Sequence, residues 1–337
     1  METKVVVLNG IDSSFEIEVR KLEELKPGFA RVKIKAAAFN RRDYWIYKGQ
    51  YAGLKFPIVL GSDGSGIVDS IHTVSDDSNH WLGKKVVILP SYNWEHDSNS
   101  QPSDFKILGL PDDGTFAEYL DVPIQNLYAM PEHLSFEEAA AFPLAGLTAY
   151  RALFKKGELS SGQNLLITGV GGGAATMALQ MGIALGAHVW VTSSSESKIE
   201  KAISLGAKGG VNYRNEDWDQ ELLSKIQGFD LIMDSALGDN FPKLIELANP
   251  GGKIVFFGGT DGNLPPINGR RIFWKQLEIK GTTMGSAVDF RNFLEFIEKH
   301  KIKPVIDEVL PIKKAQEGLL KMSSSSQFGK IILKIED

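Results

Sequence analysis

The feature that most constrains the fold of this chain is a glycine-rich turn inside a long uncharged stretch. No Asp, Glu, Lys or Arg occurs from Leu159 to Ser195, and the string Gly169-x-Gly171-x-x-Ala174 lies within it. A membrane helix needs about 20 mainly apolar residues, but clustered glycines would leave a helix in lipid poorly formed. We therefore predict a buried strand, a glycine turn and a helix of small residues, and we expect no membrane partner.

A glycine turn between a strand and a helix is a typical binding site for the pyrophosphate of a dinucleotide. Glycine allows the backbone to approach the pyrophosphate, and the helix N-terminus offers N–H groups and the positive end of its dipole. A tight turn without a ligand is the alternative, but the strand–turn–helix context favours a cofactor. The residues expected at the pyrophosphate are Gly169, Gly171, Gly172, Gly173 and Ala174.

The end of the next predicted strand indicates which dinucleotide is bound. NAD enzymes usually carry Asp or Glu about 20 residues after the glycines, at the ribose. Here Ser193–Ser195 occupies that place, the first acidic residue is Glu196, and Lys198 follows. Hydroxyl groups and a cation suit a 2′-phosphate, although Ser195 could also only cap the following helix. We expect NADP, with Ser193, Ser194 and Lys198 at the 2′-phosphate, while Tyr213 and Arg214 can add a stacking face and a second charge.

The rhythm of apolar runs divides the chain into domains. About the first 125 residues are β-rich, whereas strands and helices alternate from Asn164, which predicts a parallel sheet covered by helices on both faces. The pattern ends near Gly285, before an amphipathic helix at Phe290–His300 and a terminal strand at Lys330–Ile335 that we expect to rejoin the first domain. We predict an α/β protein with domains at residues 1–127 and 128–285 and a return segment at 286–337.

Local signals place several elements of the first domain. Its clearest strands are expected at residues 5–8, 15–19, 30–36 and 85–89. Ser135 with Glu138 three residues later has the spacing of a capping box and predicts a helix start. Ser91–Lys106 is polar and rich in Ser and Asn, so we expect a long surface loop there.

Composition excludes several classes of function. The chain has no cysteine, which excludes disulfides, thiolate nucleophiles and every cysteine-containing zinc site. Its net charge is −5 and it has no long basic run, so a nucleic-acid partner is not expected. The start of the sequence has no cationic segment followed by an apolar one, and we expect a cytoplasmic protein.

Twelve segments, in this order, resemble the medium-chain dehydrogenase/reductase superfamily. They are AAAFNRRDYWIYKG, PIVLGSDGSGIV, LGKKVVI, DGTFAEY, LSFEEAAAFPLAGLTAYRAL, GVGGGAATMALQ, LGAKGGVNY, FDLIMDSALG, PGGKIVFFG, KGTTMGS, KIKPVID and FGKIILKI. The branch it resembles is commonly labelled "zinc-type alcohol dehydrogenase-like". The resemblance implies a GroES-like β-domain, a Rossmann domain, an active site between them and a homodimer built through Rossmann edge strands. It also implies that loops at Gly258, Gly259, Thr283 and Gly285 meet the nicotinamide.

The positions that resemble metal ligands carry residues that bind metals poorly. The catalytic ligands of the zinc members fall on Asn40, on Ser62 before Asp63, and on Leu144 or its neighbour. The structural zinc lobe corresponds to residues 92–108, which contain no cysteine. A cluster at residues 95–97, Glu-His-Asp, is read as a solvated loop tip. We therefore expect no metal.

Chemistry without a metal favours an electron-poor substrate. A zinc ion stabilises an alkoxide as a Lewis acid, whereas a quinone or an α,β-unsaturated ketone needs only neutral hydrogen-bond donors for the developing enolate. The donors expected at the substrate are Asn40, Tyr44, Tyr47 and Tyr92, although each tyrosine could equally be a packing residue. Arg41 and Arg42 are expected to be surface or interface charges.

These observations predict a zinc-independent, NADPH-dependent oxidoreductase that reduces a small quinone or enone. Two alternatives stay open. One is an alcohol or aldehyde dehydrogenase with an unusual metal arrangement, for which stoichiometric metal would be the evidence. The other is a cofactor-binding sensor or structural protein, which would bind NADPH tightly without consuming it.

Overall fold

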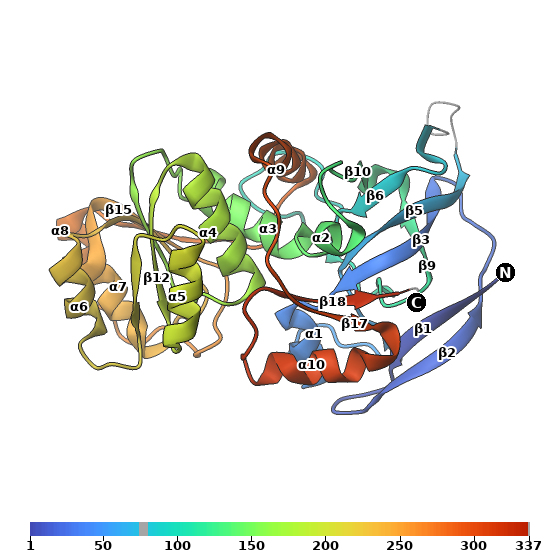
Figure 1. Ribbon diagram of the computed structural model, residues 1–337, viewed down its shortest axis with the longest axis horizontal. Coiled ribbons are helices and arrows are strands. Elements are labelled where there is room, and N and C mark those ends of the chain that lie inside the picture. The colour runs from blue at the N-terminus through green and yellow to red at the C-terminus, as the bar shows by residue number, and fades with distance from the viewer. Residues whose placement is uncertain (74–79, 336–337) are drawn as a thin grey trace. The chain divides into compact units, whose positions relative to one another are not determined.

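The computed structural model describes residues 1–73 and 80–335, which form two units (Figure 1). The first unit comprises residues 1–145 and 285–337, and the second comprises residues 146–284. We expected the second domain to begin at residue 128, but residues 128–145 belong to the first unit. The reason is that β10 (Leu127–Ala129) pairs with β6 (Lys85–Ile88), and α2 (Phe136–Ala140) packs on the same sheet.

The second unit is built on a six-stranded parallel sheet with the order β13-β12-β11-β14-β15-β16. This order confirms the predicted parallel sheet and is that of a Rossmann domain, whose switch point lies between β11 and β14. Every strand therefore ends at the same edge of the sheet. The strands are β11 (Asn164–Ile167), β12 (His188–Ser193), β13 (Gly209–Asn212), β14 (Phe229–Asp234), β15 (Ala248–Phe256) and β16 (Glu278–Gly281).

Helices connect these strands. Helices α4 and α5 pack on β11, β12 and β13, whereas α7 and α8 pack on β15 (Figure 1). A Cβ atom on Gly182 of α4 would lie 2.9 Å from the side chains of Leu165 and Val189, so this glycine allows the helix to approach the sheet closely. The helices are α3 (Pro143–Tyr150), the π-helix η3 (Arg151–Lys156), α4 (Gly173–Leu185), α5 (Glu196–Ser204), α6 (Trp218–Lys225), η4 (Gly238–Asn240), α7 (Phe241–Leu247) and α8 (Gly269–Lys275).

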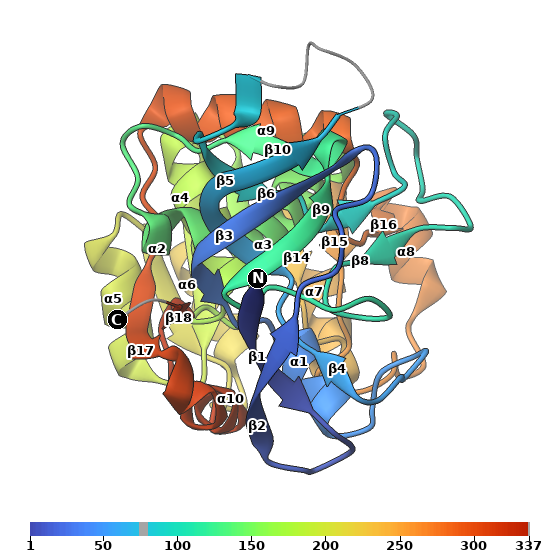
Figure 2. The same ribbon diagram turned by 90° about the vertical axis from the view of Figure 1, so that its right-hand side faces the viewer.

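The first unit is centred on a seven-stranded sheet with the order β10-β6-β5-β3-β18-β17, in which β9 also pairs with β3. Figure 2 shows β3, β5 and β6 side by side. The terminal strand β18 pairs with β3, which confirms that the chain returns to the first domain. The strands are β3 (Phe29–Ala38), β5 (Asp63–His72), β9 (Tyr119–Pro123), β17 (Ile306–Pro311) and β18 (Lys330–Lys334), with β6 and β10 as above.

Smaller elements complete the first unit. Helix α2 begins at Ser135 with the predicted capping box, and α1 lies beside α10 (Figure 1). In the parts of the chain that the structure describes, every helix is too short or too polar to span a lipid bilayer. These elements are β1 (Glu2–Leu8), β2 (Phe15–Lys21), α1 (Arg41–Tyr47), β4 (Ile58–Val59), β7 (Ser91–Tyr92), β8 (Lys106–Ile107), η2 (Ile124–Asn126), α9 (Ala287–His300), η5 (Ile312–Lys314) and α10 (Ala315–Ser323).

Candidate active site

The glycine turn of the second unit is open to an anion. Gly169 has φ +64° and Gly171 has φ +137°, a backbone conformation that favours glycine. Helix α4 begins without a side-chain cap and without an acidic residue in its first turn. A Cβ atom at Gly169 or Gly172 would have nothing within 4 Å. The N–H groups at this helix end thus fit the pyrophosphate of a dinucleotide.

The serines after β12 take different roles. Ser193 is buried, and its hydroxyl group donates to the carbonyl oxygen of Val170 at 3.3 Å, which ties the strand end to the glycine turn. Ser195 stands at the N-cap position of α5, but its side chain makes no capping hydrogen bond and instead contacts the Ser197 hydroxyl at 2.8 Å. The hydroxyl group of Ser195 therefore does not cap the helix.

Tyr213 lies close to these serines, as expected. Its backbone N–H donates to the carbonyl oxygen of Ser193 at 3.0 Å, and Lys198 lies in the first turn of α5. The carboxylate of Glu196, the nearest acid in sequence, accepts a hydrogen bond from Asn212 at 3.0 Å. The backbone thus brings Lys198, the serines and Tyr213 to one corner of the sheet edge, together with the Glu196 carboxylate, while the Tyr213 side chain packs against the core of the second unit.

Asp234, at the end of β14, was not singled out by the sequence analysis. The Thr168 hydroxyl donates to it at 2.5 Å, which joins the ends of the two central strands. Asp234 also accepts the backbone N–H groups of Ala236 and Leu237, and burial raises its pKa. An acidic residue at the end of an apolar strand was the signal that could have identified it.

Further loops follow β15 and β16 at the same edge. A Cβ atom on Gly258 would lie 2.7 Å from the carbonyl oxygen of Ser235, so two backbone segments meet there. Gly259 and Thr283 lie in these loops, whereas Gly285 is the first residue of the return to the first unit. The Thr148 hydroxyl group lies 4.0 Å from the sulfur of Met284, beside Thr283.

Asn40 joins a buried network in the first unit. It lies between β3 and α1, where the Asp43 carboxylate accepts its backbone N–H at 2.7 Å. Its amide Nδ2 donates to Asp63 Oδ2 at 2.9 Å, and its Oδ1 accepts from Lys330 Nζ at 2.7 Å. Lys330 also donates to Asp63 Oδ2 at 2.9 Å. Lys330 is 4% exposed and Asp63 is 0% exposed, so a full ion pair is enclosed here.

Asp63 connects this network to the other positions that resemble metal ligands. Its Oδ1 accepts the backbone N–H of Leu144 at 2.7 Å. The Ser62 hydroxyl donates to the carbonyl oxygen of Leu108 at 2.7 Å. Of these groups, the Asp63 carboxylate is the usual kind of zinc ligand, and both of its oxygens already accept hydrogen bonds from Leu144, Asn40 and Lys330. An amide, a bonded hydroxyl, a backbone N–H and an ammonium group do not complete a ligand set around it. The residues present therefore do not fit the metal ion that the resemblance implies.

Arg42 and Asp43 surround this network. We expected Arg42 to be a surface or interface charge, but it is buried within the first unit: it is 7% exposed and donates to Ser62 Oγ at 2.7 Å and to the carbonyl oxygen of Leu108 at 2.8 Å. The ring of Tyr51 lies 5.1 Å from its guanidinium group. Burial raises the pKa of Asp43 to about 6, although Arg42 partly opposes the shift.

The three candidate tyrosines lie on two elements. Tyr44 and Tyr47 are on α1 with ring centroids 6.4 Å apart, and both pack against the core. Tyr92 is on β7, and its buried hydroxyl has no hydrogen-bond partner among the described residues. Burial raises the pKa of Tyr92, so it remains a protonated donor at neutral pH.

The segment that resembles the structural zinc lobe has its own packing. Trp94 is buried against Phe105 with ring centroids 5.5 Å apart, and its carbonyl oxygen accepts the N–H of Ala287. Within residues 1–73 and 80–335, no group of three or more His, Asp or Glu is arranged to hold a metal ion. The predicted surface loop thus contains a buried anchor, Trp94.

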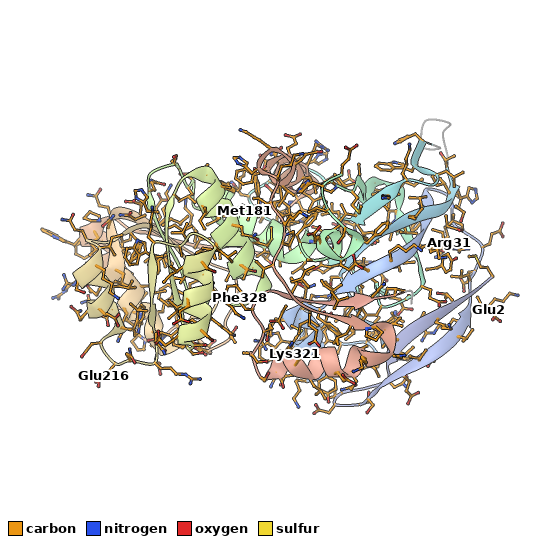
Figure 3. All side chains as sticks on the ribbon, in the orientation of Figure 1. Glu2, Arg31, Met181, Glu216, Lys321 and Phe328 are labelled. Atoms are coloured by element: carbon orange, nitrogen blue, oxygen red, sulfur yellow. The ribbon has the colours of Figure 1, made fainter. Side chains whose placement is uncertain are left out.

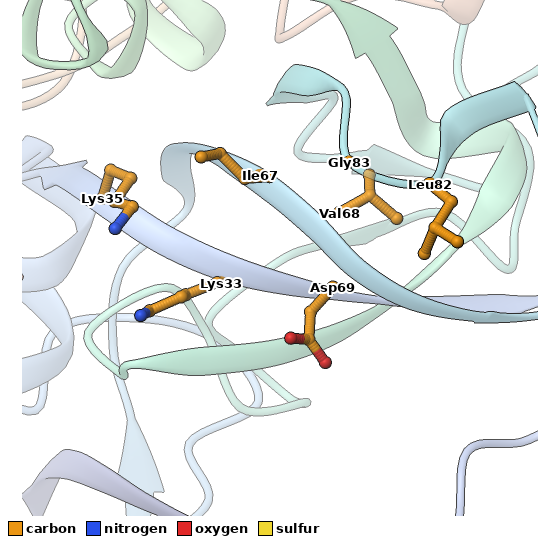
Figure 4. Close-up of a pocket in the computed structure, with 7 residues that line it drawn as sticks. All are labelled: Lys33, Lys35, Ile67, Val68, Asp69, Leu82 and Gly83. Atoms are coloured by element: carbon orange, nitrogen blue, oxygen red, sulfur yellow. The ribbon is translucent and has the colours of Figure 1, made fainter.

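A shallow hollow of about 450 Å³ lies over β3 and β5 of the first unit (Figure 4). Lys33, Lys35 and Asp69 provide its charged groups, and Leu82 is among its apolar ones. None of its lining residues belongs to the Asn40 network, so it does not extend the candidate site.

Comparison with known proteins gives consistent matches along the chain. Residues 26–132 match the alcohol dehydrogenase GroES-like domain, and residues 173–299 match the zinc-binding dehydrogenase family. A solved structure described as an NAD-dependent alcohol dehydrogenase superposes with a TM-score of 0.90 at 34% identity, covering 99% of this chain and 100% of that one.

Curated relatives cover nearly the whole chain. Zinc-type alcohol dehydrogenase-like protein YogA of Leptosphaeria maculans is 36% identical over 92% of this chain and 91% of its own length. Protein C1773.06c of Schizosaccharomyces pombe, of the same description, is 35% identical over 98% and 97%. Acryloyl-coenzyme A reductase of Sulfurisphaera tokodaii is 27% identical over 98% and 99%. The chain therefore belongs to the medium-chain dehydrogenase/reductase superfamily of oxidoreductases, together with the zinc-type alcohol dehydrogenase-like proteins.

Proposed function

We propose that this oxidoreductase transfers hydride from NADPH to a quinone or an α,β-unsaturated carbonyl compound without a metal ion. The observation that carries the proposal is the Lys330 ammonium group, bonded to Asn40 and Asp63 at the positions that resemble the metal site. A simple alcohol needs a strong Lewis acid at its oxygen, which this set of groups lacks. A conjugated acceptor takes hydride at carbon, and its enolate oxygen needs only neutral donors.

The second unit provides the features for cofactor binding. The uncapped start of α4 suits the pyrophosphate, and Ser194 and Lys198 are the proposed contacts of the 2′-phosphate. Ser193 and Tyr213 are proposed to shape this corner, through the bonds of Ser193 to the glycine turn and to the Tyr213 backbone. The bound cofactor would supply the hydride. We propose NADPH rather than NADH because Lys198 lies in the first turn of α5. The Glu196 carboxylate lies in the same turn and is held by Asn212.

The first unit provides the proposed donors to the acceptor. The Asn40 amide has two N–H bonds, and one of them is directed to Asp63. We assign the other to the acceptor oxygen, with Tyr44, Tyr47 and Tyr92 as further candidates. The hydroxyl of Tyr92 is buried and has no hydrogen-bond partner among the described residues, so it is available as a donor.

Names of relatives support two candidate reactions. A relative named acryloyl-coenzyme A reductase supports reduction of a conjugated acyl compound, in keeping with the proposal. A solved structure named NAD-dependent alcohol dehydrogenase, at 34% identity, favours alcohol oxidation as the second candidate. The two reactions differ in substrate and in the need for a metal, so one experiment separates them.

The test follows NADPH and NADH oxidation with a panel of quinones, enones and aldehydes, and reduction of both oxidised cofactors with alcohols. The protein is assayed as purified, after a chelator, and after added zinc. We expect turnover of quinone or enone with NADPH that the chelator leaves unchanged. Alcohol oxidation that is lost with the chelator and restored by zinc would overturn the proposal. Tight NADPH binding with no turnover of any substrate would show a binding protein instead.

A further inference from the structure

Lys330 is an unusual residue for its surroundings. The three residues that follow it in β18, Ile331–Leu333, are buried and apolar, yet Lys330 is also buried, at 4% exposure. Lysine is almost never this deeply buried unless its charge is paired, because the desolvation of an ammonium group costs several kcal/mol. Its position therefore has to be explained by the groups around the ammonium.

The turn before Lys330 holds the residue in place. A Cβ atom on Gly329, which has φ +115°, would lie 2.4 Å from the carbonyl oxygen of Val305, so a side chain is excluded there. Asp307 accepts the backbone N–H of Phe328 at 2.9 Å and pairs with Lys321 at 2.6 Å. Figure 3 labels Lys321 on α10 and Phe328 in the segment between α10 and β18. The chain thus enters β18 along a fixed path.

The contacts of Lys330 determine the orientation of the Asn40 amide. An ammonium group only donates hydrogen bonds, so the Asn40 atom 2.7 Å from it must be the amide oxygen. A carboxylate only accepts, so the amide nitrogen faces Asp63. Lys330 and Asp63 therefore select the same orientation of the Asn40 amide group. Its second N–H points away from Asp63.

The same contacts place a positive charge at the amide oxygen. The ammonium group compensates the Asp63 carboxylate, which is fully buried and also accepts the Leu144 N–H. A cation at the amide oxygen polarises the amide and makes its N–H groups stronger donors, and this effect is larger in a buried site.

We infer that Lys330 is a positioning residue for the Asn40 donor, and that its ammonium group holds the amide while it compensates the buried Asp63 carboxylate. It orients and polarises the Asn40 amide toward the acceptor oxygen. The part that concerns the acceptor rests on the proposed function. The part that concerns charge compensation rests only on the buried Lys330–Asp63 pair.

A stability cycle tests the charge compensation. Lys330→Met keeps the size of the side chain but leaves Asp63 as an unpaired buried carboxylate, so we expect the unfolding midpoint to fall on the order of 10 °C. Asp63→Asn in the Lys330→Met background should recover a large part of this loss. Lys334→Met, at the exposed end of the same strand, is the matched control and should leave the midpoint within about 2 °C. Additive losses in the double variant would overturn the inference.

Chemical rescue tests the cation itself. Lys330→Ala removes the atoms that propylammonium would replace, so propylammonium chloride should raise the midpoint of this variant by about 5 °C or more at saturation. Sodium chloride and 1-propanol are the controls for ionic strength and for cavity filling. An equal rise with 1-propanol would show that the side chain only fills space, and would overturn the inference.

Kinetics test the positioning of Asn40. We expect Lys330→Met to lower kcat for the quinone or enone by about tenfold to a hundredfold, with NADPH affinity and KM nearly unchanged, and Lys334→Met to behave as wild type. A kcat equal to that of wild type would overturn the positioning role. If wild-type protein turns over no acceptor, the proposed function fails, whereas the stability cycle and the propylammonium experiment still decide the role of the charge.

Discussion

At the scale of single residues, Asp43 shows what burial does to a charge. Burial raises its pKa to about 6 from 3.8. Between these two values the folded protein holds a proton that the unfolded chain has released, so this group makes the fold less stable as the pH rises through that window. At about 1.36 kcal/mol per pKa unit, the loss amounts to about 3 kcal/mol and is complete above pH 6.

Asp43→Asn removes this titration. We expect the free energy of unfolding of wild type, relative to that of the variant, to fall by about 3 kcal/mol between about pH 3.5 and pH 7. Urea unfolding at several pH values measures it. Glu24→Gln, at an exposed position of the same unit, should keep the pH dependence of wild type. Parallel curves for wild type and Asp43→Asn would show that the fold does not hold this proton.

The Asn40 amide is the donor that we expect to stabilise the acceptor oxygen during hydride transfer. Loss of one neutral donor to a developing oxyanion typically costs about 2.7–4 kcal/mol, and an enone with delocalised charge should lose less. Asn40→Ala should therefore lower kcat/KM for the quinone or enone, while NADPH affinity, measured by fluorescence titration, stays unchanged. If turnover persists and only stability falls, Asn40 is a packing residue, and Tyr47 and Tyr92 become the next candidates.

Residues of this network differ in how far sequence could identify them. Asn40 was proposed because a motif resembles a ligand position, and the glycines because their string follows a predicted strand and opens a predicted helix; φ is positive at Gly169 and Gly171. Lys330 was missed because its partner Asn40 lies 290 residues away, and a lone lysine in an apolar strand gives no sign of what it meets. Arg42 was misjudged for the same reason, since Ser62 and Leu108 reach it only through the folded sheet.

At the scale of elements, the corner formed by β12, α5 and β13 is where we expect NADPH to be distinguished from NADH. Lys198 lies in the first turn of α5, beside the serines at the end of β12. One charge-assisted bond to a phosphate contributes about 1.5–3 kcal/mol. Lys198→Ala should thus weaken NADPH binding roughly tenfold or more and leave NADH binding nearly unchanged, as measured by titration of both cofactors. Lys201→Ala, at an exposed position of the same helix, is the control. Equal losses for both cofactors would show a structural role.

Long periodic elements could be predicted, whereas some short ones could not. The helix of small residues predicted after the glycine turn is α4 (Gly173–Leu185), and the predicted alternation of strands and helices after Asn164 is present in the second unit. Helix α1 (Arg41–Tyr47) was not predicted, because seven residues form a helix only through the capping contact at Asn40 and packing on the core. The edge strand β16 (Glu278–Gly281) was not predicted because its four residues include a single apolar side chain, Ile279, whereas the equally short β11 is a run of apolar residues.

At the scale of the whole chain, the C-terminal return is what completes the candidate donor. Strand β18 pairs with β3 and carries Lys330 to Asn40, which follows β3 directly. Residues near the two ends of the sequence therefore build one network, and the second unit is inserted between them. The order of motifs predicted this return, but which side chain it would deliver depended on the register of β18 against β3.

The second unit exposes a strand edge and two aromatic side chains that predict self-association of the chain. Strand β16 is the edge of the parallel sheet, and the neighbouring α8 leaves Phe273 67% and Trp274 80% exposed. An open strand edge beside exposed aromatic rings is typical of an interface, and a second copy of this chain is the partner that the family resemblance implies. We expect a dimer of twice 37.0 kDa by analytical ultracentrifugation.

Substitution of both aromatic residues tests whether this surface forms the dimer. A lysine introduced elsewhere on the second unit is the control for a general effect of surface charge. Phe273→Ser with Trp274→Lys should shift the protein to monomers and leave its thermal midpoint within a few degrees, because neither side chain is part of the buried core. Ile203→Lys on α5 introduces the same charge at another exposed apolar position, 46% exposed, and should keep the dimer. A monomeric wild type, or a dimer that survives the double substitution, would place the partner surface elsewhere on the chain.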